Sequence, residues 1–384
     1  MSIASEITRI TDNVADAYTA ASAKGATMPV TQNSDNLAST ISTISSGGVD
    51  TKAWVPRDID ANGKLVMPTI DASSLKFNTI TDIGEYTLYN AFRNCTGMTG
   101  VVNLSSLTSI TGFYGMYYSF YGCTGITGVN LGSLVTISSN YAAGYSFQGC
   151  TGITSIDLGS LTTISGSYSM ANAFRNCTGI IGILDLGSLT TISGANGMQY
   201  TFCGCSGITG LDLGSLTTIS GANGMANAFQ DCTGITGALD LSSLTTISGK
   251  SGMYNAFQNC TGITSVDLSS LTTISGANGM HAAFWGCTGI TGVDLSSLTT
   301  ITLDWAMYYA FYGCRGLTSI SFPALKSDSF GAFTTQFNDM LSGITGCTAH
   351  FPSNLQSVIG SWQSVTNGFG GINTTVLFDL PATE

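Results

Sequence analysis

Hydrophobic and polar positions alternate along this chain in a unit that returns every 27 or 28 residues. Residues 153–158 of one unit have the spacing LxxLxL, which predicts a strand. Successive side chains of a strand point to opposite faces. We therefore expect Ile156 and Leu158 to face the interior, and Ser155 and Asp157 to face solvent.

The same unit continues with a second apolar pair, Leu161 and Ile164, which predicts a looser extended stretch. A glycine-rich corner follows. Met170, Ala173 and Phe174 then stand at i, i+3 and i+4, the positions that share one face of a helix. Each unit is thus predicted to hold one strand, one extended stretch and one short helical turn.

Nine cysteines mark the phase of the repeat, each following an Ala-Phe, Ser-Phe or Thr-Phe pair: Cys95, Cys123, Cys150, Cys177, Cys205, Cys232, Cys260, Cys287 and Cys314. A fixed period in the twenties is typical of a solenoid, in which each repeat is one coil stacked on the last. Three units carry one extra residue, at VVNL from 101, ILDL from 183 and ALDL from 238, which predicts a local bulge.

The pattern Ile-x-x-Ile-x-Leu, Leu-x-x-Ile and Ala-Phe-x-x-Cys resembles the BspA-type leucine-rich repeat of bacterial, protist and phage surface proteins. The resemblance covers about residues 65–347. It implies a leucine-rich-repeat solenoid of about 9–10 coils, an extracellular adhesion or recognition role, and no conserved catalytic residues. The family often has proline after the strand leucine; here Phe322-Pro323 keeps it, whereas the other units have Gly or Ser.

The ends depart from the repeat. Residues 1–46 place Ile3, Ile7, Ile10 and Val14 at heptad spacing, which predicts helices that anchor or oligomerise the chain, or a hairpin that simply caps the solenoid. The stretch AKGATMPVTQNSDNLASTISTI within it resembles N-terminal segments of tail proteins from phages and prophages of Gram-positive gut bacteria.

Residues 47–64 are predicted to be a linker, residues 65–347 the solenoid, and residues 348–384 a C-terminal cap. In the cap, Ser353 is expected to cap a helix that carries Leu355, Val358, Ile359 and Trp362 on one side. Residues 374–380 are expected to form a last strand that covers the open end of the solenoid.

Composition and charge limit the classes of partner that this chain can bind. Charged residues make up 9% of the chain, the formal net charge is −11, and no Lys/Arg cluster exists, so we expect no nucleic-acid partner. Hydrophobic residues make up 43%, but no apolar run has the roughly 18 residues that span a membrane. The N-terminus has no Sec-type signal pattern, so we expect synthesis and folding in a reducing cytoplasm.

Eleven cysteines raise the question of disulfides or metal. The nine phased cysteines are expected to form a single-file column of buried free thiols, because a buried thiol packs as a small hydrophobic group. Cys203 falls at a variable position and is expected to be exposed. With two histidines far apart and no GxSxG, P-loop or HExxH motif, we expect no enzymatic activity, no cofactor and no metal site.

Two surface rows are candidates for function. The first is an acidic row at the end of the predicted strands: Asp157, Asp185, Asp212, Asp240, Asp267 and Asp294, preceded by Asn103 and Asn130. Like charges at strand spacing repel, so the row requires a reason. Either it forms a cation or sugar-hydroxyl face, or each carboxylate caps the backbone amides of the turn that follows, which is the interpretation we favour.

The second row consists of outward positions that change from coil to coil while the core positions stay fixed. We assign ligand binding to its aromatic members: Tyr117, Tyr118, Tyr121, Tyr145, Tyr200, Tyr254, His281, Trp285, Tyr308, Tyr309 and Tyr312. Tyr and Trp give large, rigid contact areas, and the Asn and Gln neighbours add adaptable hydrogen bonds. The alternative is that these solvent-facing positions vary because nothing constrains their side chains, but Lys and Glu would then also be expected there.

These observations predict a non-enzymatic recognition protein. The main hypothesis is a phage tail or tail-fibre protein, located in the virion, that binds a bacterial cell-surface glycan or protein. Its N-terminal helices would contact other tail proteins or form a homo-oligomer. The alternatives are a BspA-like adhesin on a bacterial cell surface, disfavoured by the missing Sec-type signal, and a structural filament subunit.

Overall fold

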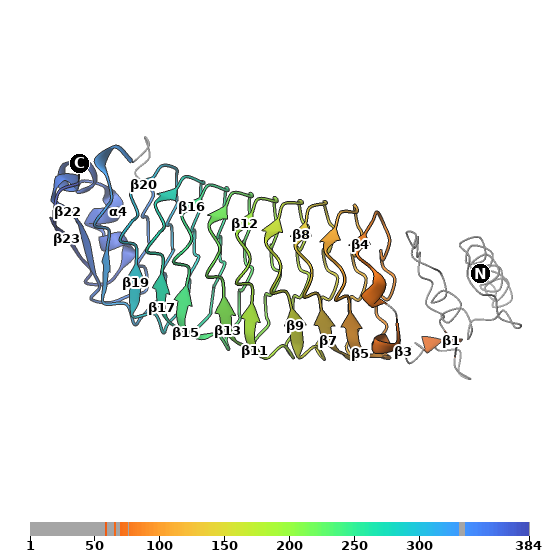
Figure 1. Cartoon of the computed structure of the whole chain (residues 1–384). Coiled ribbons are helices and arrows are strands. Elements are labelled where there is room, and N and C mark those ends of the chain that lie inside the picture. Colours follow the sequence, from red (N-terminus) through yellow and green to blue (C-terminus); the bar gives the residue numbers. More distant parts are fainter. Residues whose placement is uncertain (1–57, 60–64, 67–69, 76, 330–334, 384) are drawn as a thin grey trace, which may run out of the picture.

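The computed structural model describes residues 58–59, 65–66, 70–75, 77–329 and 335–383. The segment 1–46, with its predicted helices and phage-like stretch, lies outside the described residues, as does most of the predicted linker. Strand β1 (Asp58–Ile59) pairs antiparallel with β2 (Leu65–Val66). From β3 onward the chain forms a single row of stacked coils, which confirms the solenoid (Figure 1).

One wall of the solenoid is a nine-stranded parallel sheet of very short strands. Each coil contributes two residues, and each Thr-Ile pair lies in register with the next. This wall is the extended stretch predicted from the second apolar pair. Its strands are β4 (Asp82–Ile83), β6 (Ser109–Ile110), β8 (Thr136–Ile137), β10 (Thr163–Ile164), β12 (Thr191–Ile192), β14 (Thr218–Ile219), β16 (Thr246–Ile247), β18 (Thr273–Ile274) and β20 (Thr300–Ile301).

The second wall carries the LxxLxL strands, which form four short parallel sheets. The first sheet holds β3 (Ile70–Asp71), β5 (Met98–Asn103), β7 (Ile126–Asn130) and β9 (Ser155–Asp157). The second holds β11 (Gly182–Asp185) and β13 (Ile208–Asp212), and the third β15 (Thr236–Asp240), β17 (Gly262–Asp267) and β19 (Gly292–Asp294). The last holds β21 (Ser319–Ser321), β22 (Thr348–Pro352) and β23 (Thr375–Leu380).

The three predicted bulges are confirmed. The pairing register shifts after Gly100, Gly182 and Gly237, in the three coils whose phased cysteines lie 28 rather than 27 residues apart. Each of these glycines has a positive φ of 78° to 86°, the left-handed conformation that a one-residue bulge of this kind requires. The extra residue is accommodated on the surface: Ile183, which follows the second bulge glycine, is 76% exposed.

The third wall differs from the expected helical turn. Between Gly112 and Cys123, alternate amides donate to the carbonyl three residues back within the coil, as Tyr117 N–H does to Tyr114. The amides between them donate to carbonyls of the next coil, as Met116 N–H does to Ala142. An α-helix would use all of these amides within one coil, and none would remain to hold the next coil. The wall is therefore a run of turns.

Every fourth residue of each run of turns lies in the left-handed region, with φ between 51° and 62° where it is not glycine. The three left-handed positions of the second coil, for example, are Tyr114, Tyr118 and Gly122. In the predicted unit, Met170, Ala173 and Phe174 are buried, so the inward side of this wall was predicted correctly although its backbone was not.

The core is a set of parallel ladders along the solenoid axis. Nine phenylalanine rings, one per coil from Phe92 to Phe311, stack with centroids 5.0–5.5 Å apart and planes within 8° of parallel. Beside this phenylalanine ladder, each phased cysteine from Cys123 to Cys314 donates its thiol to the phenylalanine carbonyl of the preceding coil, at 2.9–3.2 Å.

All eleven cysteines are free and buried, which confirms the column of packing thiols. Cys203 was wrongly expected to be exposed: it is 5% exposed. It lies within the run of turns, one residue before Gly204, where the side chain of Arg175 in the preceding coil lies beside it.

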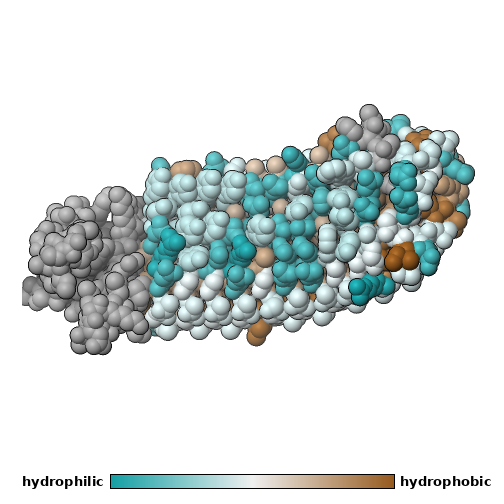
Figure 2. Space-filling view, turned by 180° about the vertical axis from the view of Figure 1, so that it is seen from behind, coloured by the Kyte–Doolittle hydropathy of each residue, from teal (hydrophilic) through white to brown (hydrophobic). Residues whose placement is uncertain are grey.

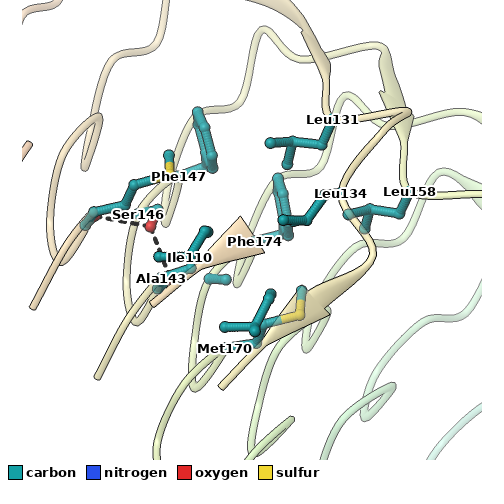
Figure 3. Close-up of a pocket in the computed structure, with 12 residues that line it drawn as sticks. Ile110, Leu131, Leu134, Ala143, Ser146, Phe147, Leu158, Met170 and Phe174 are labelled. Atoms are coloured by element: carbon teal, nitrogen blue, oxygen red, sulfur yellow. Dashed lines mark hydrogen bonds between the residues drawn. The ribbon is translucent and has the colours of Figure 1, made fainter. Parts of the chain in front are cut away.

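The interior contains no space for a ligand between the coils shown in Figure 3. The cavity there has a volume of about 10 Å³ and an apolar lining that includes Phe147, Leu158 and Phe174. The one hydroxyl that points into this region, on Ser146, is satisfied by the carbonyls of Met116 and Ala143 at 2.9 and 2.7 Å. Function must therefore be sought on the outside.

At the C-terminal end, β22 and β23 continue the parallel stacking, so about 11 turns are present and the predicted cap is partly a continuation of the solenoid. The expected last strand is confirmed as β23. The expected helix is split into η4 (Ser353–Leu355), α3 (Gln356–Ile359) and α4 (Gln363–Thr366), followed by η5 (Gly368–Gly370). Ser353 is the first residue of η4 and not its cap, because the strand runs directly into it.

Short 3-10 helices lie at other points of the described chain: η1 (Ala72–Ser74), η2 (Phe77–Thr79) and η3 (Ser327–Ser329). Leu355 and Ile359 are fully buried and Trp362 is 9% exposed, as the predicted apolar side requires. Within the described part of the chain, no helix has the length and apolar character needed to cross a bilayer.

The phenylalanine ladder yields a stability prediction. Phe202→Ala removes a ring that is fully buried and stacked on Phe174 and Phe229, so the free energy of unfolding is expected to fall by about 3–5 kcal/mol. Phe113→Ala, at a ring that is 37% exposed and contacts Tyr86, Tyr114 and Tyr141, is the comparison and is expected to cost less than Phe202→Ala. Denaturant unfolding measures both. Equal losses would show that the ladder is not the main source of packing energy.

The thiols yield a reactivity prediction. Burial raises the pKa of Cys150, Cys205 and Cys314 to about 12. The thiolate is the reactive form, so the folded protein is expected to react very slowly with a thiol-specific disulfide reagent at pH 8. After denaturation all eleven thiols should react. Rapid reaction of several thiols in the folded protein would contradict the buried column.

Candidate functional site

The predicted aromatic row lies on the third wall. We call the exposed side chains of the runs of turns the turn face; it comprises residues 86–94, 114–122, 141–149, 168–176, 196–204, 223–231, 251–259, 278–286 and 305–313. Figure 2 shows one side of the coils, where hydrophobic atoms are scattered singly and gather near the C-terminal end. The eleven predicted residues all belong to the turn face, but the structure divides ten of them between two clusters and leaves Tyr200 outside both.

The N-terminal aromatic cluster contains Tyr117, Tyr118, Tyr121 and Tyr145 of the predicted set. It also contains six aromatic residues that the sequence analysis missed: Tyr86, Tyr89, Phe113, Tyr114, Tyr141 and Tyr168. The C-terminal aromatic cluster contains Tyr254, His281, Trp285, Tyr308, Tyr309 and Tyr312, with Trp305 as the missed member. Tyr200 belongs to neither cluster and lies under the guanidinium of Arg175.

Most of the missed residues occupy one position, two residues before the buried Met or its equivalent. The expectation of a helical turn beginning at Met left this position in the glycine-rich corner. The signal was present in the sequence: Tyr114, Tyr168 and Trp305 stand where other coils have the Asn of GANG. Their left-handed φ values, 54° to 55°, place their side chains on the turn face.

The two clusters differ in ring geometry. In the N-terminal aromatic cluster, Tyr86, Tyr114, Tyr141 and Tyr168 form a stacked ladder with centroids 5.6, 5.0 and 5.0 Å apart. The ring faces in this ladder cover one another, so ring edges and hydroxyls meet solvent. Only the first and last rings have one face that no other ring of the ladder covers. Tyr168, at the end next to the middle coils, is 36% exposed.

In the C-terminal aromatic cluster four ring contacts are edge to face, three are tilted and one is stacked, and no stacked ladder forms. His281 lies edge-on to Tyr254 and Tyr308, with both centroid distances 4.8 Å. Trp285 stacks on Tyr312 at 4.2 Å, and Trp305 is 46% exposed. Without a stacked ladder, the rings of this cluster do not cover one another's faces in series, which leaves it suited to stacking against a ligand.

The backbone under the clusters is unfavourable for aromatic residues. Eight of the 15 tyrosines, together with Trp305, lie at left-handed positions: Tyr86, Tyr114, Tyr118, Tyr141, Tyr145, Tyr168, Tyr200 and Tyr309. For L-residues other than Gly this conformation costs roughly 1–2 kcal/mol, and Asn and Asp tolerate it best. The middle coils use Asn at the same positions, for example Asn196, Asn223 and Asn227, with the same hydrogen bonds.

Four aromatic groups of the turn face have shifted pKa values that favour their uncharged forms. Burial raises the pKa of Tyr117 and Tyr145, and the hydrogen bond with Tyr309 raises the pKa of Tyr308 to about 12. Burial lowers the pKa of His281 to about 4. The hydroxyls and the imidazole can therefore offer neutral hydrogen bonds to a ligand.

The acidic row is explained by local capping. The Oδ1 atom of each of Asp185, Asp212 and Asp240 accepts from the amide two residues later, at 2.9–3.0 Å. The same bond occurs at the other members of the row: Asn103, Asn130, Asp157, Asp267 and Asp294. This confirms the capping interpretation. No three His, Cys, Asp or Glu side chains within the described ranges lie close enough to hold a metal ion.

One shallow groove lies on the strand wall near the C-terminal end, with a volume of about 480 Å³. Its lining includes Asp267, Asp294, Ser321 and Pro323. Both carboxylates already accept from backbone amides, which leaves their second oxygens for solvent or a ligand hydroxyl.

His350 lies on the strand wall of the last coils, whereas His281 lies on the turn face, so the two histidines do not share a site. His350 Nδ1 bonds Asp379 at 2.9 Å, and Ser321 is its register partner on β21. The described structure shows no hydrogen bond between Ser321 and His350, and Asp379 is 45% exposed. We therefore assign no catalytic role to this row.

Comparison with protein families identifies the repeat. The BspA type Leucine rich repeat region (6 copies) matches residues 69–209, 170–301 and 199–338, which together span most of the chain. The chain belongs to the BspA-type leucine-rich-repeat family.

Solved structures of leucine-rich-repeat proteins resemble the chain at low identity. One from Bacteroides ovatus is 17% identical, with 78% of this chain and 88% of that chain covered and a TM-score of 0.31. A leucine-rich cell surface protein from Faecalibacterium prausnitzii is 16% identical, with 77% and 83% covered and a TM-score of 0.27. No curated protein matches the chain. None of the matches described here is to a phage tail protein.

The imidazole of His281 yields a pH prediction. Between about pH 6.5 and pH 4 the unfolded chain binds a proton that the folded chain does not, so stability is expected to fall as the pH falls through this window. NMR titration should show His281 neutral at pH 5. His281→Gln is the control and should remove this part of the pH dependence of unfolding. An imidazole that is protonated at pH 6 in the folded protein would contradict the burial argument.

Proposed function

We propose that this BspA-type protein is a non-enzymatic recognition protein that binds a partner molecule on a cell surface through the aromatic clusters of its turn face. The observation that carries the proposal is the placement of eight tyrosines and Trp305 at left-handed positions. Strained conformations of this kind gather at ligand-binding sites when the surrounding structure holds them in place.

The fold itself does not require these aromatic side chains. The middle coils hold Asn or Ser at the same positions, as at Asn196, Asn223 and Ser251, and their turn amides make the same bonds to the next coil. Stacking contributes about 0.5–1.5 kcal/mol per pair in the N-terminal aromatic cluster and offsets part of the strain there. Trp305 and Tyr309 lack such a ladder, which makes the C-terminal aromatic cluster the stronger candidate.

The chemistry of the turn face favours a glycan or a protein surface as partner. Tyrosine hydroxyls, ring faces and the Asn and Gln side chains of the middle coils combine apolar contact with neutral hydrogen bonds. The surface extends over nine coils and has no deep cavity, so it suits an extended or flat partner.

Family membership favours an adhesin on a bacterial cell surface over a phage tail protein. BspA-type repeats imply extracellular adhesion or recognition, and the tail-fibre hypothesis depended on residues 23–44, which lie outside the described structure. The heptad pattern in residues 1–46 remains our proposed element for anchoring or oligomerisation. The family implies no catalytic residues, and the proposal includes no chemical step.

The clusters can be tested with substitutions that the chain already uses. Trp305→Asn with Tyr309→Asn alters the C-terminal aromatic cluster, and Tyr118→Asn with Tyr145→Asn alters the N-terminal one. Each places Asn at a left-handed position, so the fold should be kept. Binding of labelled protein to a panel of gut bacteria and to mammalian matrix proteins is expected to fall at least about tenfold in one or both double variants.

Asn223→Ser is the matched control, since Ser251 occupies the same position in the next coil. Circular dichroism and denaturant unfolding verify that the variants remain folded. If both double variants bind the cells or matrix proteins as tightly as the unaltered chain, the turn face is not the recognition surface.

A further inference from the structure

Two arginines occupy equivalent positions on the turn face, three coils apart. Arg93 and Arg175 both stand in the local sequence Ala-Phe-Arg-Asn-Cys. The guanidinium carbon of Arg93 lies 4.5 Å from the ring centroid of Tyr118 in the next coil. The guanidinium carbon of Arg175 lies 5.0 Å from that of Tyr200, the equivalent tyrosine. The same arginine–tyrosine pair is thus built twice.

The surroundings of the two pairs also match. Asn94 and Asn176 follow the arginines at left-handed positions, and the next coil has glycine opposite each asparagine. A Cβ atom at Gly122 or Gly204 would come within 2.6 or 2.5 Å of the asparagine Oδ1 atom. Glycine therefore lets each asparagine side chain pack closely against the next coil beside the arginine. The packing beside the two arginines is alike, except that the guanidinium carbon of Arg93 also lies 5.2 Å from the ring centroid of Tyr121, where the second pair has Cys203.

The charge of these arginines is not neutralised within the described structure. The chain has twice as many Asp and Glu as Lys and Arg, 22 against 11. Yet neither guanidinium forms an ion pair with a carboxylate among the described residues. Arg175 donates one N–H, on Nη1, to Asn172 Oδ1 at 3.3 Å. The other N–H groups of a guanidinium stacked on a ring can still bind a planar anion.

Polar atoms without partners lie in the same coils. Asn90 Oδ1, Gln148 Oε1 and Arg175 Nε are buried and have no hydrogen-bond partner among the described residues. Buried polar atoms are normally paired, and an exception requires an explanation. All three lie on the part of the turn face that extends from the first arginine–tyrosine pair to the second. These atoms have almost no exposed area, so a bound sugar pairs with them only where it displaces a covering side chain.

We infer that the Arg93–Tyr118 and Arg175–Tyr200 pairs are two subsites for an acidic polysaccharide. Each guanidinium binds one anionic group of the ligand, while the tyrosines and amides contact the sugar rings and hydroxyls. The coils are about 5 Å apart along the axis, so the two subsites engage separated charges of one extended chain. This inference rests on the proposed function. It adds the charge of the ligand and the part of the turn face that binds the charged groups.

Binding of defined glycans to the immobilised full chain tests the inference. The probes are oligogalacturonate for carboxylates, dextran sulfate for sulfates, a polyglycerol-phosphate teichoic acid for phosphates, and neutral dextran as reference. At least one acidic probe is expected to bind at least about tenfold more tightly than neutral dextran, with affinity falling as salt is raised. Which acidic probe binds identifies the source of the anion.

Arg93→Gln and Arg175→Gln are expected to weaken acidic-probe binding about tenfold each, and the double variant should reduce it to the level of neutral dextran. Arg315→Gln is the matched control, because it removes the same charge from an exposed arginine outside the turn face and should leave binding unchanged. Arg93 is exposed, so its variant separates a loss of binding from a loss of folding.

Equal binding of dextran and the acidic probes, failure of every acidic probe to bind, or equal effects of Arg93→Gln and Arg315→Gln would overturn the inference. The proposed function would survive each of these results if the Asn variants of the aromatic clusters still abolish binding to cells. If every variant keeps both its cell binding and its acidic-probe binding, the inference and the proposed function are both refuted.

Discussion

The rest of the structure depends on how the backbone amides in each run of turns are shared. Alternate amides close turns within a coil, and the amides between them donate to the next coil, as Phe120 N–H does to Ser146. This division gives the backbone amides hydrogen-bond partners without a helix, and it holds adjacent coils about 5 Å apart. At that spacing one phenylalanine ring stacks on the next, and one thiol reaches the carbonyl of the coil before it.

The same constraint determines what the surface can present. Sharing the amides in this way requires every fourth residue to be left-handed, and the aromatic residues at these positions are at least partly exposed. A chain selected for stability alone would place Gly, Asn or Asp at each such position, as the middle coils largely do. The aromatic residues at both ends of the solenoid depart from this rule, and a local departure from an otherwise consistent sequence is expected at functional sites.

Periodicity allowed the solenoid, its two strand walls, the buried faces and the three bulges to be predicted from sequence, because these features repeat in phase. The run of turns could not be predicted, because Met170, Ala173 and Phe174 have helical spacing and only contact with neighbouring coils selects turns instead. That error had a consequence. With positions such as Tyr114, Tyr168 and Trp305 assigned to a glycine-rich corner, seven of the 17 residues in the two clusters were missed, although the predicted row itself lies on the turn face.

The most direct test of this account is the free energy of unfolding of Trp305→Asn relative to the unaltered chain. If Trp305 is present for a ligand, replacing it by the residue that its left-handed position favours should leave stability unchanged or raise it by up to about 1 kcal/mol. A loss of more than about 1 kcal/mol would contradict the account, because it would show that the exposed ring stabilises the solenoid.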